Sequence, residues 1–160
     1  TRVMLISLIA AAVVADQLTK TAALSLLSQG TAVPVLPGFN LSLGFNTGAS
    51  FGMMGGVMAG KPLLMAALTG ALTLAFAVMA FRAQHPLERI GYGLVAGGAL
   101  GNIIDRLRQG AVTDFLDFYW RDWHWPTFNV ADIAITLGAV LILAASFPLC
   151  RRKEPVLDQH

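Results

Sequence analysis

Long apolar runs separated by short polar segments are the feature that most constrains the fold of this chain. Hydrophobic residues make up 56% of its 160 residues, whereas charged residues make up only 12%. Several of these runs approach the ~20 residues that a helix needs to cross ~30 Å of hydrocarbon. The presence of several such runs argues against a single signal segment followed by a soluble domain. We therefore expect an integral membrane protein.

Four segments are predicted to be membrane-spanning helices, because each is apolar and is bounded by charges or turn residues. These spans cover residues 3–26, 62–81, 90–107 and 129–149. Two longer outer segments connect them, at residues 28–61 and 108–128. The expected fold class is mainly α, a four-transmembrane-helix bundle. No internal repeat or domain boundary is visible, so residues 1–160 are expected to form one domain.

The basic residues predict the orientation of the bundle. Four spans place both termini on one side, together with the polar hairpin at residues 82–89. Most basic residues then share that side: Arg2, Arg82, Arg89, Arg151, Arg152 and Lys153. Cytoplasmic segments are enriched in Lys and Arg, so both termini are expected to be cytoplasmic and the longer segments extracytoplasmic. The same placement accounts for the net charge of +2 without a nucleic-acid function.

The two outer segments carry different patterns. Residues 32–46 alternate apolar with small or polar residues around glycine turns, which predicts a small β-sheet. Residues 46–56 are apolar and rich in glycine, which suits a mobile lid on the membrane surface. The second outer segment contains aromatic residues that typically anchor at a membrane interface, so no catalytic role is expected for them: Phe118, Tyr119, Trp120, Trp123 and Trp125.

Polar residues fall at similar heights near the outer ends of three predicted spans. They are Asp16, Lys20, Asn102, Asp105, Asn129 and Asp132. With a rise of ~1.5 Å per residue, those in the first and third spans lie about 18 Å or more above the cytoplasmic ends. Each set has i, i+3 or i, i+4 spacing and therefore shares a helix face. Because polar groups facing lipid cost several kcal/mol, they are predicted to turn inward into one outward-opening pocket.

Structural interpretations remain open for several of these charges. Some could be supporting ion pairs near helix ends: Asp16 with Lys20, and Asp105 with Arg106 or Arg108. Asp132 could be an acid favoured by the N-terminal end of a helix dipole. Asp117 and Asp122 are expected to be solvated loop charges. The tripeptide from Asn46 to Gly48 could be only a turn.

Metal and disulfide chemistry find no support in the sequence. The single cysteine, Cys150, allows neither an intrachain disulfide nor a cysteine-based metal cage. The three histidines do not form a visible metal-binding triad.

Small residues at Gly93, Gly97 and Gly101 predict that the third span packs closely against a neighbouring helix.

Five motifs together resemble the bacterial lipoprotein signal peptidases, the type II signal peptidases, over nearly the whole chain. They lie at residues 16–20 (DQLTK), 46–51 (NTGASF), 97–106 (GGALGNIIDR), 112–115 (VTDF) and 128–132 (FNVAD). The resemblance implies an aspartyl endopeptidase of the bacterial inner membrane, with its active site towards the periplasmic side. Its implied substrate is a diacylglyceryl-modified prolipoprotein, cut immediately before the lipidated cysteine. No cofactor is implied; membrane lipids are expected partners, and a monomer is expected.

The resemblance also assigns roles residue by residue. Asp114 and Asp132 correspond to the catalytic pair. The supporting residues line or brace the site: Asn46, Gly48, Asn102, Asp105, Arg106 and Asn129. Asp16 and Lys20 correspond to the first-helix motif, for which a mainly structural role is expected.

General chemistry supports a role for paired carboxylates. Two close carboxyl groups cannot both ionise readily, so one can polarise a carbonyl while the other activates water.

Two other classes of function remain as alternatives. An ion-coupled transporter also gathers acids in a membrane, although its sites usually lie near the midplane between repeats. A non-catalytic membrane scaffold would leave the aligned acids unexplained.

Overall fold

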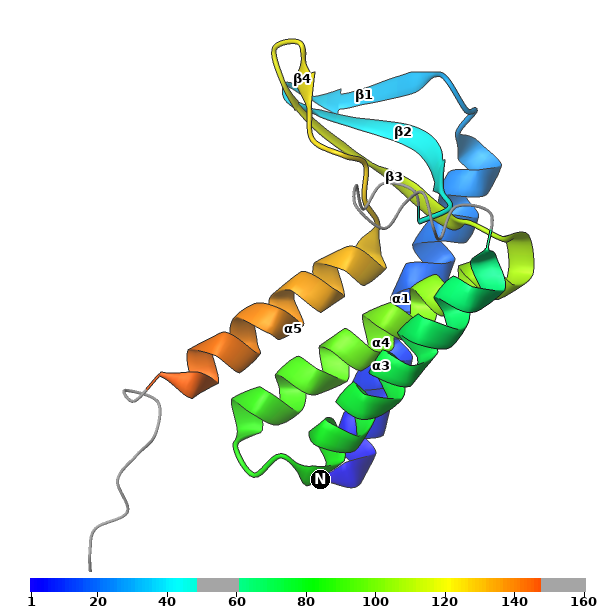
Figure 1. Ribbon diagram of the computed structural model, residues 1–160. Coiled ribbons are helices and arrows are strands. Elements are labelled where there is room, and N and C mark those ends of the chain that lie inside the picture. Colours follow the sequence, from blue (N-terminus) through cyan, green and yellow to red (C-terminus); the bar gives the residue numbers. More distant parts are fainter. Residues whose placement is uncertain (49–60, 148–160) are drawn as a thin grey trace, which may run out of the picture.

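The computed structural model describes residues 1–48 and 61–147, in which helices lie along one another and a small sheet crosses one end (Figure 1). The helices are α1 (Arg2–Leu26), α3 (Pro62–Arg82), α4 (Pro86–Gln109) and α5 (Val130–Ser146). The strands are β1 (Ala32–Leu36), β2 (Phe39–Asn46), β3 (Val112–Trp120) and β4 (Trp123–His124). The N-terminus lies at the end of the molecule remote from the sheet.

Helices occupy all four predicted spans, with small shifts in their bounds. The largest shift is at α4, which begins at Pro86 rather than residue 90, so the link from α3 is shorter than the predicted polar hairpin. Proline suits this position because the first helical N–H has no partner within the helix. The C-terminal part of the fourth predicted span and the basic tail lie outside the described residues, as does most of the predicted lid.

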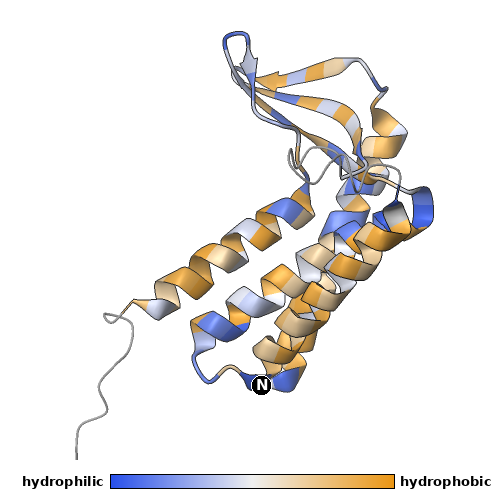
Figure 2. Cartoon of the chain, viewed as in Figure 1, coloured by the Kyte–Doolittle hydropathy of each residue, from blue (hydrophilic) through white to orange (hydrophobic). Residues whose placement is uncertain are grey.

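Two of the described helices are long and apolar enough to cross a membrane by themselves, α1 and the segment Leu63–Arg82 of α3. Helix α5 is apolar but shorter, with 17 residues. Figure 2 shows mostly hydrophobic residues along α3 and α5, while hydrophilic residues concentrate near the sheet and at helix ends. This distribution suits a bundle with lipid around its sides.

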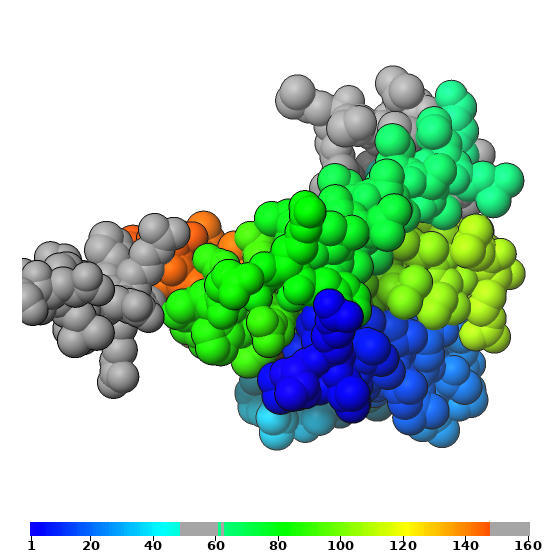
Figure 3. Space-filling model, turned by 90° about the horizontal axis from the view of Figure 1, so that it is seen from below, coloured from blue at the N-terminus to red at the C-terminus, as the bar shows by residue number. Residues whose placement is uncertain are grey.

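Helix α4 lies at the centre of the bundle because its glycines allow close approach on two faces. On one face, a Cβ at Gly97 would lie 2.8 Å from Cβ of Ala12 in α1. On the other face, a Cβ at Gly98 would collide with the backbone oxygen of Ala131 in α5. Seen from below, α1, α3 and α4 form one continuous packed surface (Figure 3). The predicted close packing of this span is therefore confirmed.

The sheet is antiparallel, with strand order β1-β2-β3-β4. The two strands predicted within residues 32–46 are confirmed as β1 and β2. Their tight turn requires Gly38, whose φ of 86° is unfavourable for other residues. The second outer segment also forms strands, β3 and β4, which the sequence pattern did not predict. Pairing of Asn46 with Val112 places the end of β2 beside the start of β3.

Replacing Gly98 by Ala is expected to destabilise the α4–α5 contact by about 1–3 kcal/mol, because backbone rather than a flexible side chain obstructs the new methyl group. Thermal unfolding in detergent measures the effect as a lower Tm. Gly70→Ala is the matched control, because a Cβ there meets nothing within 4 Å in helix α3. That control should be neutral or stabilising by up to about 1 kcal/mol. Equal effects of both substitutions would contradict the packing role of Gly98.

Candidate active site

Lys20 is a buried cation at the centre of a polar network near the sheet. Its Nζ lies 2.8 Å from Oδ2 of Asp16 and 3.0 Å from Oδ2 of Asp105. It also donates a 2.9 Å hydrogen bond to Oδ1 of Asn102. Three acceptors satisfy the three donors of an ammonium group. The predicted Asp16–Lys20 pair is confirmed, whereas the expected pairing of Asp105 with an arginine is wrong because Asp105 turns towards Lys20.

The two aspartates that hold Lys20 also connect to the elements beyond it. Oδ1 of Asp16 accepts a 2.9 Å hydrogen bond from the backbone N–H of Ala131, in the first turn of α5. Oδ2 of Asp105 accepts one of the same length from the backbone N–H of Thr113, in β3. The side chain of Gln17 donates to both carboxylates. The network therefore joins α1, α4, α5 and β3.

Asn129 is the N-cap residue of α5 and connects the two aspartates predicted to be catalytic. Its Oδ1 accepts a 3.0 Å hydrogen bond from the backbone N–H of Asp132, whose Oδ2 in turn accepts from the backbone N–H of Asn129 at 3.2 Å. This reciprocal arrangement is a capping box. The amide nitrogen Nδ2 of Asn129 also donates to Oδ1 of Asp114 at 2.7 Å. One residue thus positions both carboxyl groups.

Asn102 completes the support of this pair from helix α4. Its Nδ2 donates a 3.0 Å hydrogen bond to Oδ1 of Asp132, while its Oδ1 accepts from Lys20. Oδ1 also accepts a longer hydrogen bond, 3.3 Å, from Nδ2 of Asn129. The polar residues of three predicted spans therefore meet, as the helical spacing predicted.

Asp114 lies on β3 and is only 4% exposed. Burial, and after it the negative charge of Asp132, raise the pKa of its carboxyl group from the ordinary 3.8 to about 7. Hydrogen bonds from Asn129 and Asn46 oppose the shift. Burial penalises the charged form, and a neighbouring carboxylate adds repulsion. Asp114 therefore retains a proton up to about neutral pH.

Arg106 provides a second buried positive charge beside this pair. Its guanidinium group interacts electrostatically with Asp132, Asp114 and Asp105. Its Nε has no hydrogen-bond partner among residues 1–48 and 61–147. A buried guanidinium donor is costly to leave unpaired, so this group is available for an incoming acceptor.

Asn46 and Gly48 lie at the end of β2, beside the start of β3. Oδ1 of Asn46 accepts a 2.8 Å hydrogen bond from the backbone N–H of Gly48, and Gly48 has a φ of 89°. The turn interpretation of this tripeptide is therefore correct. This turn does not exclude a role at the site, because the side chain of Asn46 also lowers the pKa of Asp114 through a hydrogen bond.

Sequence reasoning missed two sets of contacts, one within the network and one in the sheet. Gln17 and Thr113 lie within the recognised motifs and hydrogen-bond to the aspartates of the network. No periodic pattern in the sequence predicts these contacts. Asp117 was expected to be solvated; this is wrong, because it is 4% exposed. It accepts a hydrogen bond from Asn40 and pairs with Nδ1 of His124 at 2.8 Å across the β3–β4 hairpin. The unpredicted strands explain this burial.

The network is reached by a polar pocket of about 250 Å³ between α1 and α4, lined in part by Lys20, Asp105 and Arg108. Asp114 and Asp132 are not among its lining residues. Asp132 is partly exposed. Within residues 1–48 and 61–147, no group of three or more His, Cys, Asp or Glu side chains is arranged to hold a metal ion.

Comparison with known proteins agrees with the motifs that meet at this site. The sequence profile described as signal peptidase (SPase) II matches residues 8–148. The chain belongs to the signal peptidase II family. A lipoprotein signal peptidase of Hydrogenovibrio crunogenus is 42% identical over 89% of this chain and 84% of its own length. One of Burkholderia mallei is 45% identical over 80% and 78%, respectively.

Two solved structures share the fold of this signal peptidase II family member, and both are described as a bacterial membrane enzyme. One has a TM-score of 0.79 and 29% identity, with 91% of this chain and 93% of that chain covered. The other has a TM-score of 0.78 and 28% identity, with 94% and 93% covered. The similarity therefore includes both the helices and the sheet.

Replacing Lys20 by Met is expected to lower the free energy of unfolding by about 3–5 kcal/mol, because Asp16 and Asp105 would face each other without a cation. Thermal unfolding in detergent should show a large fall in Tm. Lys61→Met is the matched control at an exposed lysine, where a change within about 0.5 kcal/mol is expected. An unchanged Tm for the Lys20 variant would contradict the structural role of this cation.

Proposed function

We propose that this chain is an aspartic-type endopeptidase that removes the signal peptide from diacylglyceryl-modified prolipoproteins, cutting immediately before the lipidated cysteine. The observation that carries the proposal is the placement of two carboxyl groups, from β3 and α5, around the single side chain of Asn129. The relatives named lipoprotein signal peptidase supply the substrate class. Asp114 and Asp132 are the proposed catalytic residues.

The two carboxyl groups act as one unit that shares a proton at neutral pH. Asp114 is the protonated member, in keeping with its pKa of about 7. Asp132 is the acceptor, because both of its oxygens already receive N–H donors. Asp132 takes a proton from water as the water oxygen attacks the scissile carbonyl carbon. Asp114 transfers its proton to the carbonyl oxygen, which gives a neutral tetrahedral intermediate with two hydroxyl groups.

The second half of the reaction returns both protons. Asp114 takes a proton from one hydroxyl group as the carbonyl re-forms and the C–N bond breaks. Asp132 gives its proton to the departing nitrogen of the cysteine. The pair then has its starting protonation, with one water consumed and no cofactor required.

The remaining polar residues hold this geometry or bind the substrate. Asn129 and Asn102 orient the carboxyl groups, and the network of Asp16, Lys20 and Asp105 fixes the helix that carries Asp132. Arg106 offers a substrate carbonyl its Nε, which has no partner among the described residues, and offsets negative charge at the pair. Asn46 and Gly48 form the edge of the site at the end of β2.

The placement of the pair next to the sheet suits a substrate that lies in the bilayer. We assign four membrane crossings to α1, α3, α4 and α5, with both termini cytoplasmic and the sheet on the periplasmic side of the inner membrane. A signal-peptide helix must stay in lipid, where its backbone groups satisfy one another, while its cleavage site reaches the polar boundary. A monomer provides all the residues of this site.

Asp114→Asn or Asp132→Asn is expected to reduce cleavage of a diacylated prolipoprotein by about 10³-fold or more, because either change removes a proton-transfer group. Mass spectrometry of the products of the purified protein measures this loss. Asp122→Asn is the matched control, since Asp122 is exposed at the hairpin tip. Normal turnover by either dyad variant would remove the catalytic assignment.

The raised pKa of Asp114 gives a pH dependence with a defined sign. Between pH 3.8 and about 7 the folded protein holds a proton on Asp114 that the unfolded chain has lost. The free energy of unfolding should therefore fall as the pH rises through this window. Cleavage should also fall as the pH rises above about 7, because Asp114 loses the proton that it gives to the carbonyl.

Tm and cleavage rate measured from pH 5 to 9 test both trends, with the range chosen to span about two units on each side of the pKa of Asp114. Asp114→Asn should flatten the fall of Tm relative to the native chain and should not lower Tm at alkaline pH. A cleavage rate that climbs steadily above neutral pH would contradict the assignment of the proton to Asp114.

A further inference from the structure

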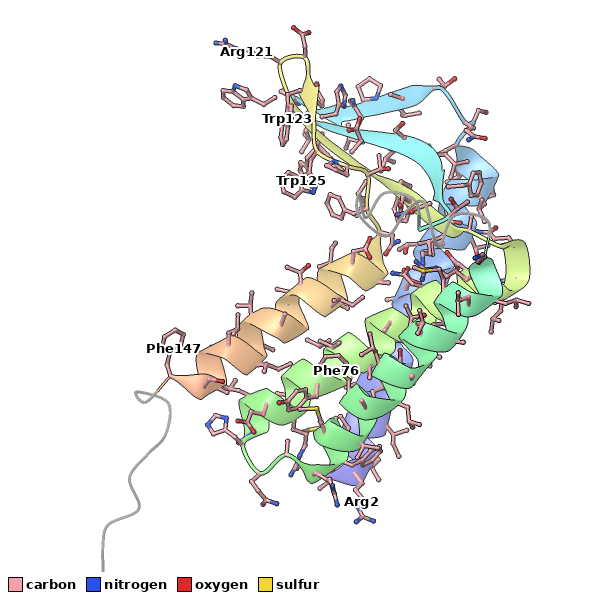
Figure 4. The ribbon with its side chains drawn as sticks, in the orientation of Figure 1. Arg2, Phe76, Arg121, Trp123, Trp125 and Phe147 are labelled. Carbon is pink, nitrogen blue, oxygen red and sulfur yellow. The ribbon has the colours of Figure 1, made fainter. Side chains whose placement is uncertain are left out.

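An open aromatic groove lies on the sheet, on the far part of β3 from Asp114. Its volume is about 390 Å³, and aromatic side chains provide nearly all of its lining: Phe118, Tyr119, Trp120, Trp123, Trp125 and Phe128. Trp123 and Trp125 are 59% and 56% exposed. Figure 4 shows both of these side chains projecting from the sheet on the side where α5 lies. Apolar patches of this kind mark binding surfaces.

The groove is built from ordered contacts. Phe118 stacks on Phe128 with ring centroids 5.7 Å apart, and Trp123 meets Trp125 edge to face at 5.8 Å. The pair of Asp117 with His124, whose side chain is half exposed, ties β4 to β3 in the same hairpin. The hairpin thus presents its aromatic rings in a defined arrangement.

The groove is continuous with the candidate active site through Phe128. The carbonyl oxygen of Phe128 accepts hydrogen bonds from the backbone N–H groups of Phe115 and Leu116, which follow Asp114 in β3. Phe128 also directly precedes Asn129, whose side chain holds Asp114. Phe118 lies four positions after Asp114 in β3, or at most ~13 Å away at ~3.3 Å per residue. A long group attached beside a bond held at Asp114 can reach the groove.

We infer that this groove binds an acyl chain of the diacylglyceryl group on the substrate's cysteine, an inference that rests on the proposed function. The chemistry fits, because none of the lining side chains is charged and aromatic faces bury large apolar areas. The position fits as well, because the lipidated cysteine is next to the bond that is cut. The aromatic hairpin is thus a specificity determinant for the lipid on the substrate.

Intrinsic fluorescence provides a direct test, because all three tryptophans of the chain line the groove. Asp114→Asn protein in detergent micelles is mixed with a prolipoprotein whose acyl chains carry bromine, which quenches tryptophan on contact. Marked quenching relative to the unbrominated substrate is expected. A second arm combines brominated detergent with unbrominated substrate. Quenching in that arm alone would show that the groove faces bulk lipid, and this result would overturn the inference.

Cleavage kinetics provide the matching functional test. Trp125→Ala should raise KM by about tenfold for a substrate with long acyl chains, which corresponds to about 1.4 kcal/mol. For a butyryl-length analogue the same variant should leave KM nearly unchanged, and kcat should hold for both. Phe147→Ala is the control, since Phe147 is an exposed aromatic at the far end of α5 (Figure 4). An equal rise in KM for both acyl lengths would overturn the inference.

The two proposals fail in different ways. If the native chain cleaves no diacylated prolipoprotein, the proposed function itself is overturned. If it cleaves normally but shows neither substrate-dependent quenching nor dependence on acyl length at Trp125, only the groove assignment is overturned.

Discussion

The structure depends on providing hydrogen-bond acceptors for the ammonium group of Lys20, which is buried away from water. Lys20 is 2% exposed, and its three donors meet acceptors on α1 and α4. A buried charge is tolerated only when its partners are well placed, so this group requires a narrow range of helix positions. The same two aspartates then bind backbone N–H groups of α5 and β3. One ionic centre thereby aligns the elements that carry Asp114 and Asp132.

Asn129 both caps helix α5 and positions the carboxyl groups that are proposed to be catalytic. A helix must provide acceptors for its first N–H groups, and Asn129 with Asp132 does this at the start of α5. The remaining amide donor of Asn129 is directed at Asp114. The interpretation of Asp132 as an ordinary acid at a helix N-terminus is therefore correct as structure, and it is compatible with the proposed role in catalysis. Capping holds the carboxylate in the orientation that the proposed reaction needs.

The sheet fixes the distance between the two regions that are proposed to bind the substrate. Strand β3 carries Asp114 at its inner end and aromatic residues at its outer end, so a rigid element relates the proposed reacting bond to the proposed acyl groove. Asp117 contributes from the middle of the strand by fixing the hairpin through His124. Distances along a strand are nearly invariant, which suits a site that must recognise two chemically different parts of one substrate.

Much of this arrangement could be predicted from the sequence, because the patterns are local. Apolar runs predicted the four helices, alternation predicted β1 and β2, and helical spacing predicted that Asp16, Lys20 and Asn102 share inward faces. The motifs predicted the family. Tertiary structure alone decided that Asp105 pairs with Lys20 rather than with an arginine, that Asp117 is buried, and that residues 112–124 form strands. These outcomes depend on which backbone lies opposite each residue. The glycine spacing of α4 predicted close packing but not which helix packs on which face. Strand pairing between distant segments leaves no periodic signal in the chain.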